Sequence, residues 1–268
     1  MIKTPLRYPG GKAKALPMIL SFVPSFSEYR EPFVGGGSVY LALKQKQSNA
    51  KFWVNDLNKE LYFFWFMLKE NPEALISEIQ NVKDSKINGK ELYTSLLAPA
   101  DRNPLDRAVR FFLLNRMTFS GTIESGGYSQ ESYEKRFTQS SIERLKETSP
   151  LLKKTEITNS DFSEVLSREG DDVFIFLDPP YFTASKLYGK KGDLHEAFDH
   201  ERFADVMKTC KHRWLITYDD CPEVREMFSF ASINSWEFQY GMNNYGQEKA
   251  AKGKEVIISN FESNMAEL

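Results

Sequence analysis

The sequence predicts an α/β fold built on a mostly parallel sheet, with an α-rich segment inserted between its strands. Residues 28–56 run strand, Gly-rich turn, helix, strand, and this β-α-β order places its strands parallel. Apolar residues take helical spacing over 57–156, which interrupts the strands. The alternation resumes over 155–220, and two late strands, 232–240 and 254–261, are expected to pair antiparallel at the sheet edge.

Local sequence predicts each element in turn. An irregular, basic segment at 1–12 precedes a predicted helix at 13–23. Further along, the predicted strand at 51–56 ends in an acid. The helical spacing of 61–80 restarts after Pro72, because proline cannot continue a helix. The later elements are helices near 104–117, 139–149 and 199–211, and strands at 155–162, 174–177 and 213–220. We therefore expect one domain from 1–56 and 157–268, and an inserted domain from 57–156.

The composition is that of a soluble globular protein, with 268 residues, 41% hydrophobic and 27% charged. A net charge of −2 argues against a sequence-blind nucleic-acid binder, which is usually strongly basic. A local basic face stays open, because the first sixteen residues carry no acid and four basic residues, Lys3, Arg7, Lys12 and Lys14.

The two cysteines, Cys210 and Cys221, lack the spacing of metal ligands, so no metal site is predicted. So few cysteines, together with the lack of a signal peptide, indicate a cytoplasmic protein. No apolar run is long enough to span a bilayer, so we expect no membrane association.

The glycines at 35–37 follow a strand, where glycine lets the backbone turn tightly and approach a ligand. Asp56 ends the next strand, where an acid can accept both hydroxyls of a ribose. Together they point to an adenosine-containing cofactor. The alternatives are an ordinary turn after a strand and a helix cap, supplied by Asp56 or Asn58.

The segment RYPGGK, residues 7–12, narrows the choice of cofactor. Lys12 can face a carboxylate with Tyr8 packed beside it, and a free carboxylate belongs to amino-acid cofactors such as S-adenosylmethionine. Dinucleotides have none, and the glycine spacing does not fit their fingerprint. The alternative is a surface turn with a solvated lysine.

The stretch FIFLDPPYF, residues 174–182, is an apolar strand that ends in an acid, two prolines and an aromatic. Asp178 only accepts hydrogen bonds, and Pro179 and Pro180 offer carbonyls without N–H groups. Such acceptors suit the amino group of a base, whose nitrogen gains charge as it reacts. Tyr181 can stack on the base. A base in a duplex would have to be flipped out to reach this turn.

In RYPGGK, EPFVGGGSV, ND at 55–56, SDF at 160–162 and DPPY, the chain resembles the Dam-like, D12-class DNA adenine-N6 methyltransferases over essentially its whole length. The resemblance implies a Rossmann-like methyltransferase sheet of seven strands and a catalytic turn formed by Asp178, Pro179, Pro180 and Tyr181. The implied S-adenosylmethionine contacts are Tyr8, Gly10, Gly11, Lys12, Glu31, Phe33, Gly35, Gly37, Asp56, Asp161, Phe162 and Asp178.

The resemblance extends into the insertion, which it identifies as a domain that recognises double-stranded DNA. LNRMTFSG resembles the stretch that opens the family's recognition hairpin, and Phe119 stands where the family places an aromatic wedge. Glu124 stands where GATC-methylating members carry arginine, so we expect another target sequence. The implied DNA-binding residues are Arg7, Asn115, Arg116, Phe119, Ser120, Gly121, Thr122 and Glu124.

Several alternatives stay open. The same chemistry serves N4-cytosine and RNA amino-methyltransferases, whereas an intact DPPY disfavours a silent DNA-binding module, and the lack of the dinucleotide fingerprint disfavours a dehydrogenase. The polar stretch 182–198 fits either a clamp on DNA phosphates or a solvated loop. A companion restriction endonuclease is conceivable, and a monomer is the default expectation.

Overall fold

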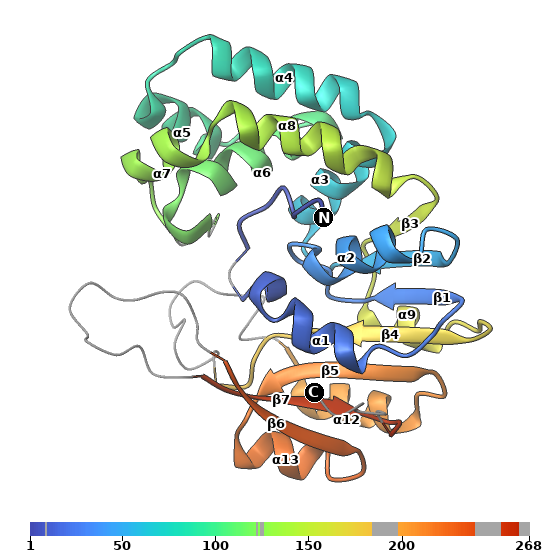
Figure 1. The fold of residues 1–268 in the computed structure, drawn as a ribbon. Helices are drawn as coiled ribbons and strands as arrows, with labels where there is room; N and C mark the ends of the chain where they lie inside the picture. The colour runs from blue at the N-terminus through green and yellow to red at the C-terminus, as the bar shows by residue number, and fades with distance from the viewer. Residues whose placement is uncertain (9, 122, 124–125, 184–197, 239–252, 263–268) are drawn as a thin grey trace. The chain divides into compact units, whose positions relative to one another are not determined.

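The computed structural model describes residues 1–8, 10–121, 123, 126–183, 198–238 and 253–262 (Figure 1). The chain divides into two compact units. The first contains Met1–Leu16 and Val34–Phe162, and the second contains Pro17–Phe33 and Ser163–Leu268. The expected insertion, 57–156, lies within the first unit, and its status as a separate domain stays a prediction.

The sheet confirms the predicted fold class. It has seven strands in the order β3-β2-β1-β4-β5-β7-β6. The pairs β1–β4, β2–β3 and β4–β5 are parallel, and β7 pairs antiparallel with β5 and β6. The strands are β1 Glu28–Glu31, β2 Lys51–Asn55, β3 Thr155–Thr158, β4 Val173–Leu177, β5 Arg213–Asp219, β6 Ser232–Phe238 and β7 Gly253–Ser259. The expected antiparallel pair of late strands is therefore β6 with β7.

Most helices of the first unit lie in the segment whose apolar spacing predicts helix. They are α2 Ser38–Lys46, α3 Lys59–Glu70, α4 Pro72–Asp84, α5 Gly89–Leu97, α6 Pro104–Met117, α7 Gln130–Arg136 and α8 Gln139–Thr148, with short 3-10 turns η1 Lys12–Lys14, η2 Phe119–Gly121 and η3 Ser149–Leu152. Pro72 separates α3 from α4, as predicted. In Figure 1, α4 and α8 lie side by side. The rings of Phe64 in α3 and Phe112 in α6 stack at 6.0 Å inside this helical core.

In the described residues, the other helices are α1 Leu16–Phe22, α9 Phe162–Ser167, α12 His200–Thr209 and α13 Pro222–Met227. The predicted helix at 13–23 is thus split into η1 and α1. Every residue of β4 is buried, and Phe174 stacks on Phe26 with ring centroids 6.0 Å apart. In the described part of the chain, no helix is long and apolar enough to cross a membrane.

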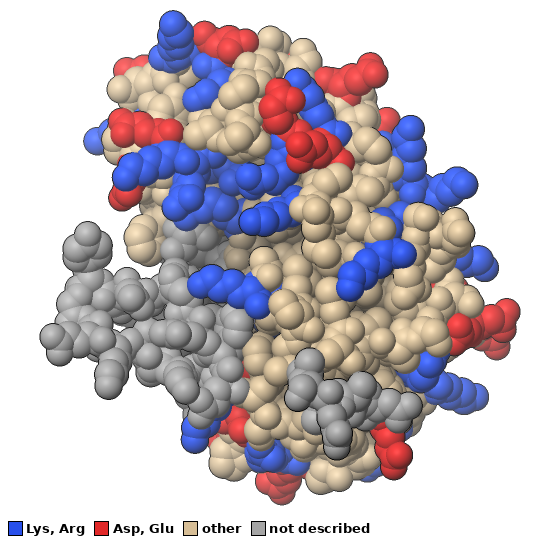
Figure 2. Space-filling model, in the orientation of Figure 1, with Lys and Arg blue, Asp and Glu red and all other residues tan. Residues whose placement is uncertain are grey.

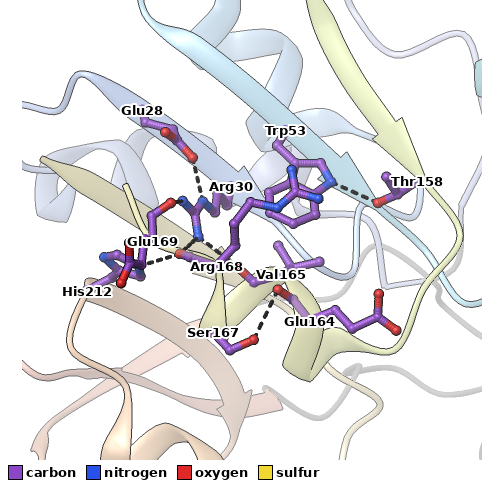
Figure 3. A network of polar contacts seen from close by, with 10 residues as sticks. All are labelled: Glu28, Arg30, Trp53, Thr158, Glu164, Val165, Ser167, Arg168, Glu169 and His212. Atoms are coloured by element: carbon purple, nitrogen blue, oxygen red, sulfur yellow. Dashed lines mark hydrogen bonds and ion pairs between the residues drawn. The ribbon is translucent and has the colours of Figure 1, made fainter. Parts of the chain in front are cut away.

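Arg30 in β1 joins the strand to the end of α9 within the second unit (Figure 3). Its side chain is fully buried, and its Nε donates to Glu28 at 2.6 Å. Its two terminal nitrogens donate to three backbone carbonyls at the end of α9 and just beyond it, those of Val165, Arg168 and Glu169. Helix-end carbonyls lack partners within the helix, so the guanidinium supplies the missing donors.

Candidate active site

The Gly-rich turn of the first unit packs against Tyr8. Gly35 and Gly37 have positive φ, 46° and 67°, a backbone conformation that favours glycine. A Cβ at Gly35 would meet the Tyr8 ring at 2.9 Å, and one at Gly36 would meet Tyr8 Cβ at 2.8 Å. The Trp65 indole donates to the carbonyl of Gly35 at 3.0 Å. The turn therefore has room for no side chain, and its backbone is held in place from two sides.

Asp56, at the end of β2, is tied to this turn. Its Oδ2 accepts the Gly35 N–H at 2.9 Å, and its Oδ1 accepts the Asn58 N–H at 3.0 Å. Burial raises the pKa of Asp56 to about 6, although the two N–H donors favour the charged form. Asn58, not Asp56, caps α3, since its side chain accepts the N–H groups of Glu60 and Leu61. Asp56 is thus left for a role other than helix capping.

Lys12 also lies in the first unit and is buried. Its ammonium donates to the carbonyl of Gly10 at 2.9 Å, and the Gly11 N–H donates to the carbonyl of Tyr8 at 3.0 Å. These contacts hold Lys12 and the two glycines close to Tyr8, and their contact with a cofactor stays a prediction. The lysine is not the solvated side chain of the alternative interpretation, since only 6% of it is exposed.

The segment after β3 is held next to the end of β2. Asn55 donates to the carbonyl of Ser160 at 3.0 Å and accepts the Ser160 N–H at 2.9 Å. Asn159 donates to the carbonyls of Asp56 and Leu57 at 2.8 and 3.0 Å. These bonds bring the SDF motif to the acid that ends β2. Within that motif Asp161 is partly exposed and Phe162 is buried.

Glu31 and Phe33 belong to the second unit. Glu31, at the end of β1, is 2% exposed and accepts the Tyr29 hydroxyl at 2.5 Å. Phe33 packs edge-on against Phe198 and Phe203, with centroids 5.7 and 5.9 Å away. Both residues thus have packing and hydrogen-bonding roles in the unit itself, and their contact with a cofactor stays a prediction.

The DPPY turn lies at the end of β4 in the second unit and is contacted by β5. The Thr217 hydroxyl donates to Asp178 Oδ1 at 2.9 Å, and Tyr181 stacks on Tyr218 at 6.0 Å. Pro179 is buried, whereas Asp178 and Tyr181 are partly exposed. Burial raises the pKa of Tyr181 well above its usual range, and so does the Asp178 carboxylate. The Tyr181 side chain therefore stays a neutral phenol.

Three residues of β5 that contact this turn are missing from the sequence-based set: Thr217, Tyr218 and Asp219. Asp219 accepts the N–H groups of Phe182 and Thr183, each at 2.9 Å. The available signal was the acid at the end of RWLITYDD, which repeats the pattern of the strands ending at Asp56 and Asp178. Which turn such an acid holds depends on strand order, which the sequence does not state.

A hairpin-like segment, which begins at Thr118 and ends at Tyr128 where these two residues form an antiparallel bridge, follows α6 in the first unit. Asn115 ties this segment to the start of the chain. Asn115 is fully buried, accepts the Arg7 N–H at 3.0 Å, and donates to the carbonyls of Arg7 and Gly121. Gly121 has φ 77°, and a Cβ there would lie 2.5 Å from the Arg7 carbonyl oxygen. Phe119, at the start of η2, is 65% exposed. Phe119, the predicted wedge, therefore lies at the surface, whereas Asn115, which holds this segment, is buried.

Arg116 is the centre of an arginine cluster in the first unit, formed with Arg7, Arg136 and Arg144. Its side chain is 3% exposed, yet Nε and Nη2 have no hydrogen-bond partner in the described part of the chain. Burial, together with the charges of the three other arginines, lowers the pKa of Arg116 to about 9. In Figure 2, Lys and Arg side chains gather over the helical part of this unit.

Some predicted residues lie outside the described ranges. These are Thr122, Glu124 and most of the stretch 182–198, including Lys186, Lys190 and Lys191. The backbone of Ser120 belongs to η2, and its side chain is not described. The target-sequence prediction that rests on Glu124 therefore stays a prediction.

Comparison with known proteins gives a family and several relatives. The model of the D12 class N6 adenine-specific DNA methyltransferase family matches residues 8–242. The chain is 26% identical over 282 residues to the type II methyltransferase M1.LlaDCHI of Lactococcus lactis subsp. cremoris, covering 95% of this chain and 94% of that protein. It is 28% identical over 244 residues to a DNA adenine methylase of Vibrio cholerae, covering 85% and 86%. It is also 28% identical over 208 residues to the type II methyltransferase M.MjaIII of Methanocaldococcus jannaschii, covering 69% and 71%.

Proposed function

Because the chain belongs to the D12 class N6 adenine-specific DNA methyltransferases, we propose that it flips an adenine out of duplex DNA and methylates its exocyclic amine. The protein is an adenine-specific DNA methyltransferase that depends on S-adenosylmethionine. The observation that carries the finer proposal is the DPPY turn, in which Thr217 holds the Asp178 carboxylate at the end of β4. The N4-cytosine alternative is disfavoured, since such enzymes usually carry serine in place of Asp178.

The first unit supports a site for the nucleoside and amino-acid parts of S-adenosylmethionine. Because the Gly-rich turn has no side chains and packs against Tyr8, its backbone can approach a bound ligand closely. Asp56 is suited to accept the ribose hydroxyls, and Lys12 to neutralise a carboxylate. We propose that the SDF motif lies near the adenine. The cofactor supplies an electrophilic methyl group on a positively charged sulfur.

The second unit supports the transfer step. We propose that the amine of the flipped adenine donates its hydrogens to Asp178 and to the Pro179 carbonyl, while Tyr181 stacks on the base. These acceptors stabilise the positive charge that grows on the nitrogen in the transition state. Hydroxyl donation by Thr217 fixes one oxygen of Asp178, so the carboxylate is oriented before the substrate arrives.

The hairpin-like segment and the arginine cluster support duplex DNA as the partner. An exposed aromatic on a buried support suits a wedge that fills the space left by a flipped base. A buried guanidinium with two nitrogens that lack hydrogen-bond partners in the described residues, set beside other arginines, suits a backbone phosphate. A companion restriction endonuclease stays a prediction of the sequence, as does a monomeric state.

One assay tests the proposed function directly. Unmethylated duplex DNA is incubated with the protein and methyl-labelled S-adenosylmethionine, then digested to nucleosides. We expect label in N6-methyldeoxyadenosine, and sequencing of the methylated sites gives the target. Label in N4-methyldeoxycytidine, or only in RNA when both are offered, would refute the proposal. Methylation at plain GATC would refute the prediction drawn from Glu124.

Cofactor affinity is expected to fall as the pH drops through about 6. The pKa of Asp56 is raised to about 6, and only the ionised carboxylate accepts both ribose hydroxyls. Protonation of one group lowers affinity by up to about tenfold per pH unit. Calorimetric titration of S-adenosylmethionine between about pH 5 and about pH 8 measures this. Asp56→Asn should bind more weakly with a flatter pH profile, and equal slopes for both proteins would contradict the assignment.

Replacing Arg116 by methionine is expected to stabilise the free protein while weakening DNA binding. The change removes a buried cation that repels three others, so we expect a higher melting temperature. Loss of one phosphate contact should lower the slope of log affinity against log salt by about one. Thermal melting and DNA binding at several salt concentrations measure the two effects. Arg102→Met, outside the cluster, should leave the slope unchanged, and a lower melting temperature with an unchanged slope for Arg116→Met would argue against the phosphate site.

A further inference from the structure

We propose that Asp219 is a positioning residue, which holds the DPPY turn in its reactive shape through two backbone hydrogen bonds. Its Oδ1 accepts the Phe182 N–H and its Oδ2 accepts the Thr183 N–H, each at 2.9 Å. The inference rests on the proposed function, because it assigns a residue that supports the same catalytic turn. Asp219 itself lies two residues beyond Thr217 and need not touch the base.

The turn needs an anchor of this kind because of its prolines. Pro179 and Pro180 have no N–H groups, so the middle of the turn cannot donate to a neighbouring strand. Beyond Tyr181, the next two donors are the N–H groups of Phe182 and Thr183, and both are taken by one carboxylate. Because the carboxylate accepts two consecutive N–H groups, it fixes the orientation of the backbone after Tyr181 as well as the distance between that backbone and β5.

Three consecutive residues of β5 match the turn in order. Thr217 bonds Asp178, Tyr218 stacks on Tyr181, and Asp219 binds the backbone that follows. The end of β5 can therefore fix the position of the turn, because β5 is itself held in the sheet by parallel pairing with β4 and antiparallel pairing with β7.

The burial of Asp219 indicates a specific role for its charge. Only 8% of the residue is exposed, and its neighbour across the strand pair is Glu255, a second buried acid. A buried carboxylate beside other acids is costly unless hydrogen bonds stabilise it. The two backbone donors provide that stabilisation. A neutral asparagine would keep one acceptor and would present an amide N–H to a second donor.

The expected consequence is a loss of rate with cofactor binding preserved. Without Asp219 the turn can shift, and a misplacement of about 1 Å at a reacting group lowers rates about 10²-fold. The residues suited to hold the ribose and carboxylate of the cofactor, Asp56 and Lys12, belong to the other unit of the chain. The single-turnover rate should therefore fall while the dissociation constant of S-adenosylmethionine changes little.

The test compares Asp219→Ala and Asp219→Asn with Asp220→Asn as the matched control. Asp220 is the next residue, and its carboxylate pairs with Arg225 instead of the turn. Single-turnover methylation is measured at saturating cofactor and DNA, well below the melting temperature of each variant. We expect about a 10²-fold loss for Asp219→Ala, a smaller loss for Asp219→Asn, and a rate near wild type for Asp220→Asn.

Two results would overturn the inference. One is a rate for Asp219→Ala equal to that of Asp220→Asn. The other is a loss of cofactor affinity or of folded protein that accounts for the whole loss of rate, since Asp219 would then be a structural residue only. Failure of the proposed function looks different, because the wild-type protein itself would then leave adenine unmethylated.

Discussion

Replacing Asp178 by alanine is expected to lower the rate of methyl transfer about 10³-fold, the upper range for removing one group that stabilises transition-state charge. The carboxylate accepts the Thr217 hydroxyl at 2.9 Å, and this bond orients it at the end of β4. Its charge matters most when the adenine nitrogen becomes positive, so the loss should appear in kcat more than in the KM for DNA. Asp178→Asn keeps the shape but offers one acceptor fewer and should lose nearly as much.

The matched control for this change is Asp172→Asn at the opposite end of the same strand. Asp172 immediately precedes β4, is exposed, and pairs with Arg213 and Ser27. Single-turnover assays with labelled cofactor should show a rate near wild type for this control. If Asp178→Ala retained more than about a tenth of the wild-type rate, the turn would not be the site of transfer.

Replacing Arg30 by methionine is expected to reduce the free energy of unfolding by about 3–5 kcal/mol, the range for breaking a buried ion pair from one side. The guanidinium is fully buried, and its loss leaves Glu28 and three carbonyls around the end of α9 without their donors. Arg30→Lys should recover little, because one ammonium cannot reach the same set of acceptors. Urea unfolding and thermal melting measure the change.

Arg213→Met is the control for this prediction. Arg213 makes an exposed ion pair with Asp172 and donates to the carbonyl of Ser25, and exposed pairs contribute about 0–1 kcal/mol. A destabilisation by Arg30→Met no larger than that of Arg213→Met would mean that the carbonyls find other partners. Gly170→Ala tests the same guanidinium site from a second position, because a Cβ at residue 170 would lie 2.5 Å from Arg30 Nη2 and would displace it.

Patterns within short stretches predicted much of this fold. The β-α-β order around the Gly-rich turn, the helix restart at Pro72 and the antiparallel pairing of β6 with β7 were all expected, and the structure has all three. The helix expected at 13–23 was wrong in detail, because the chain first forms η1 and begins α1 only at Leu16. Proline at 17 is compatible with such a start, since it suits the first turn of a helix.

Some candidate site residues could be found from local sequence patterns, and others depend on contacts between distant parts of the chain. Spacing along the chain indicated Gly35, Asp56 and Asp178, because each stands directly at the end of a strand or in the turn after it. Asn115 came from resemblance, and its role as a clamp on Arg7 needs a contact across 108 positions. Asp219 was missed for a related reason, since its partners lie 37 and 36 positions earlier in the chain.

By itself, the sequence determined which chemical groups stand at the strand ends: a carboxylate and two prolines without N–H groups in DPPY, a glycine turn without side chains, and a lysine suited to a carboxylate. Residue type and local spacing are enough for that, because backbone preferences and hydrogen-bonding capacity act over a few residues. Only the tertiary structure decided which side chains hold these motifs, namely Thr217 and Asp219 at the DPPY turn and Asn115 at the hairpin-like segment. The physical reason is that such partners meet through strand order and packing, which bring together segments far apart in the chain.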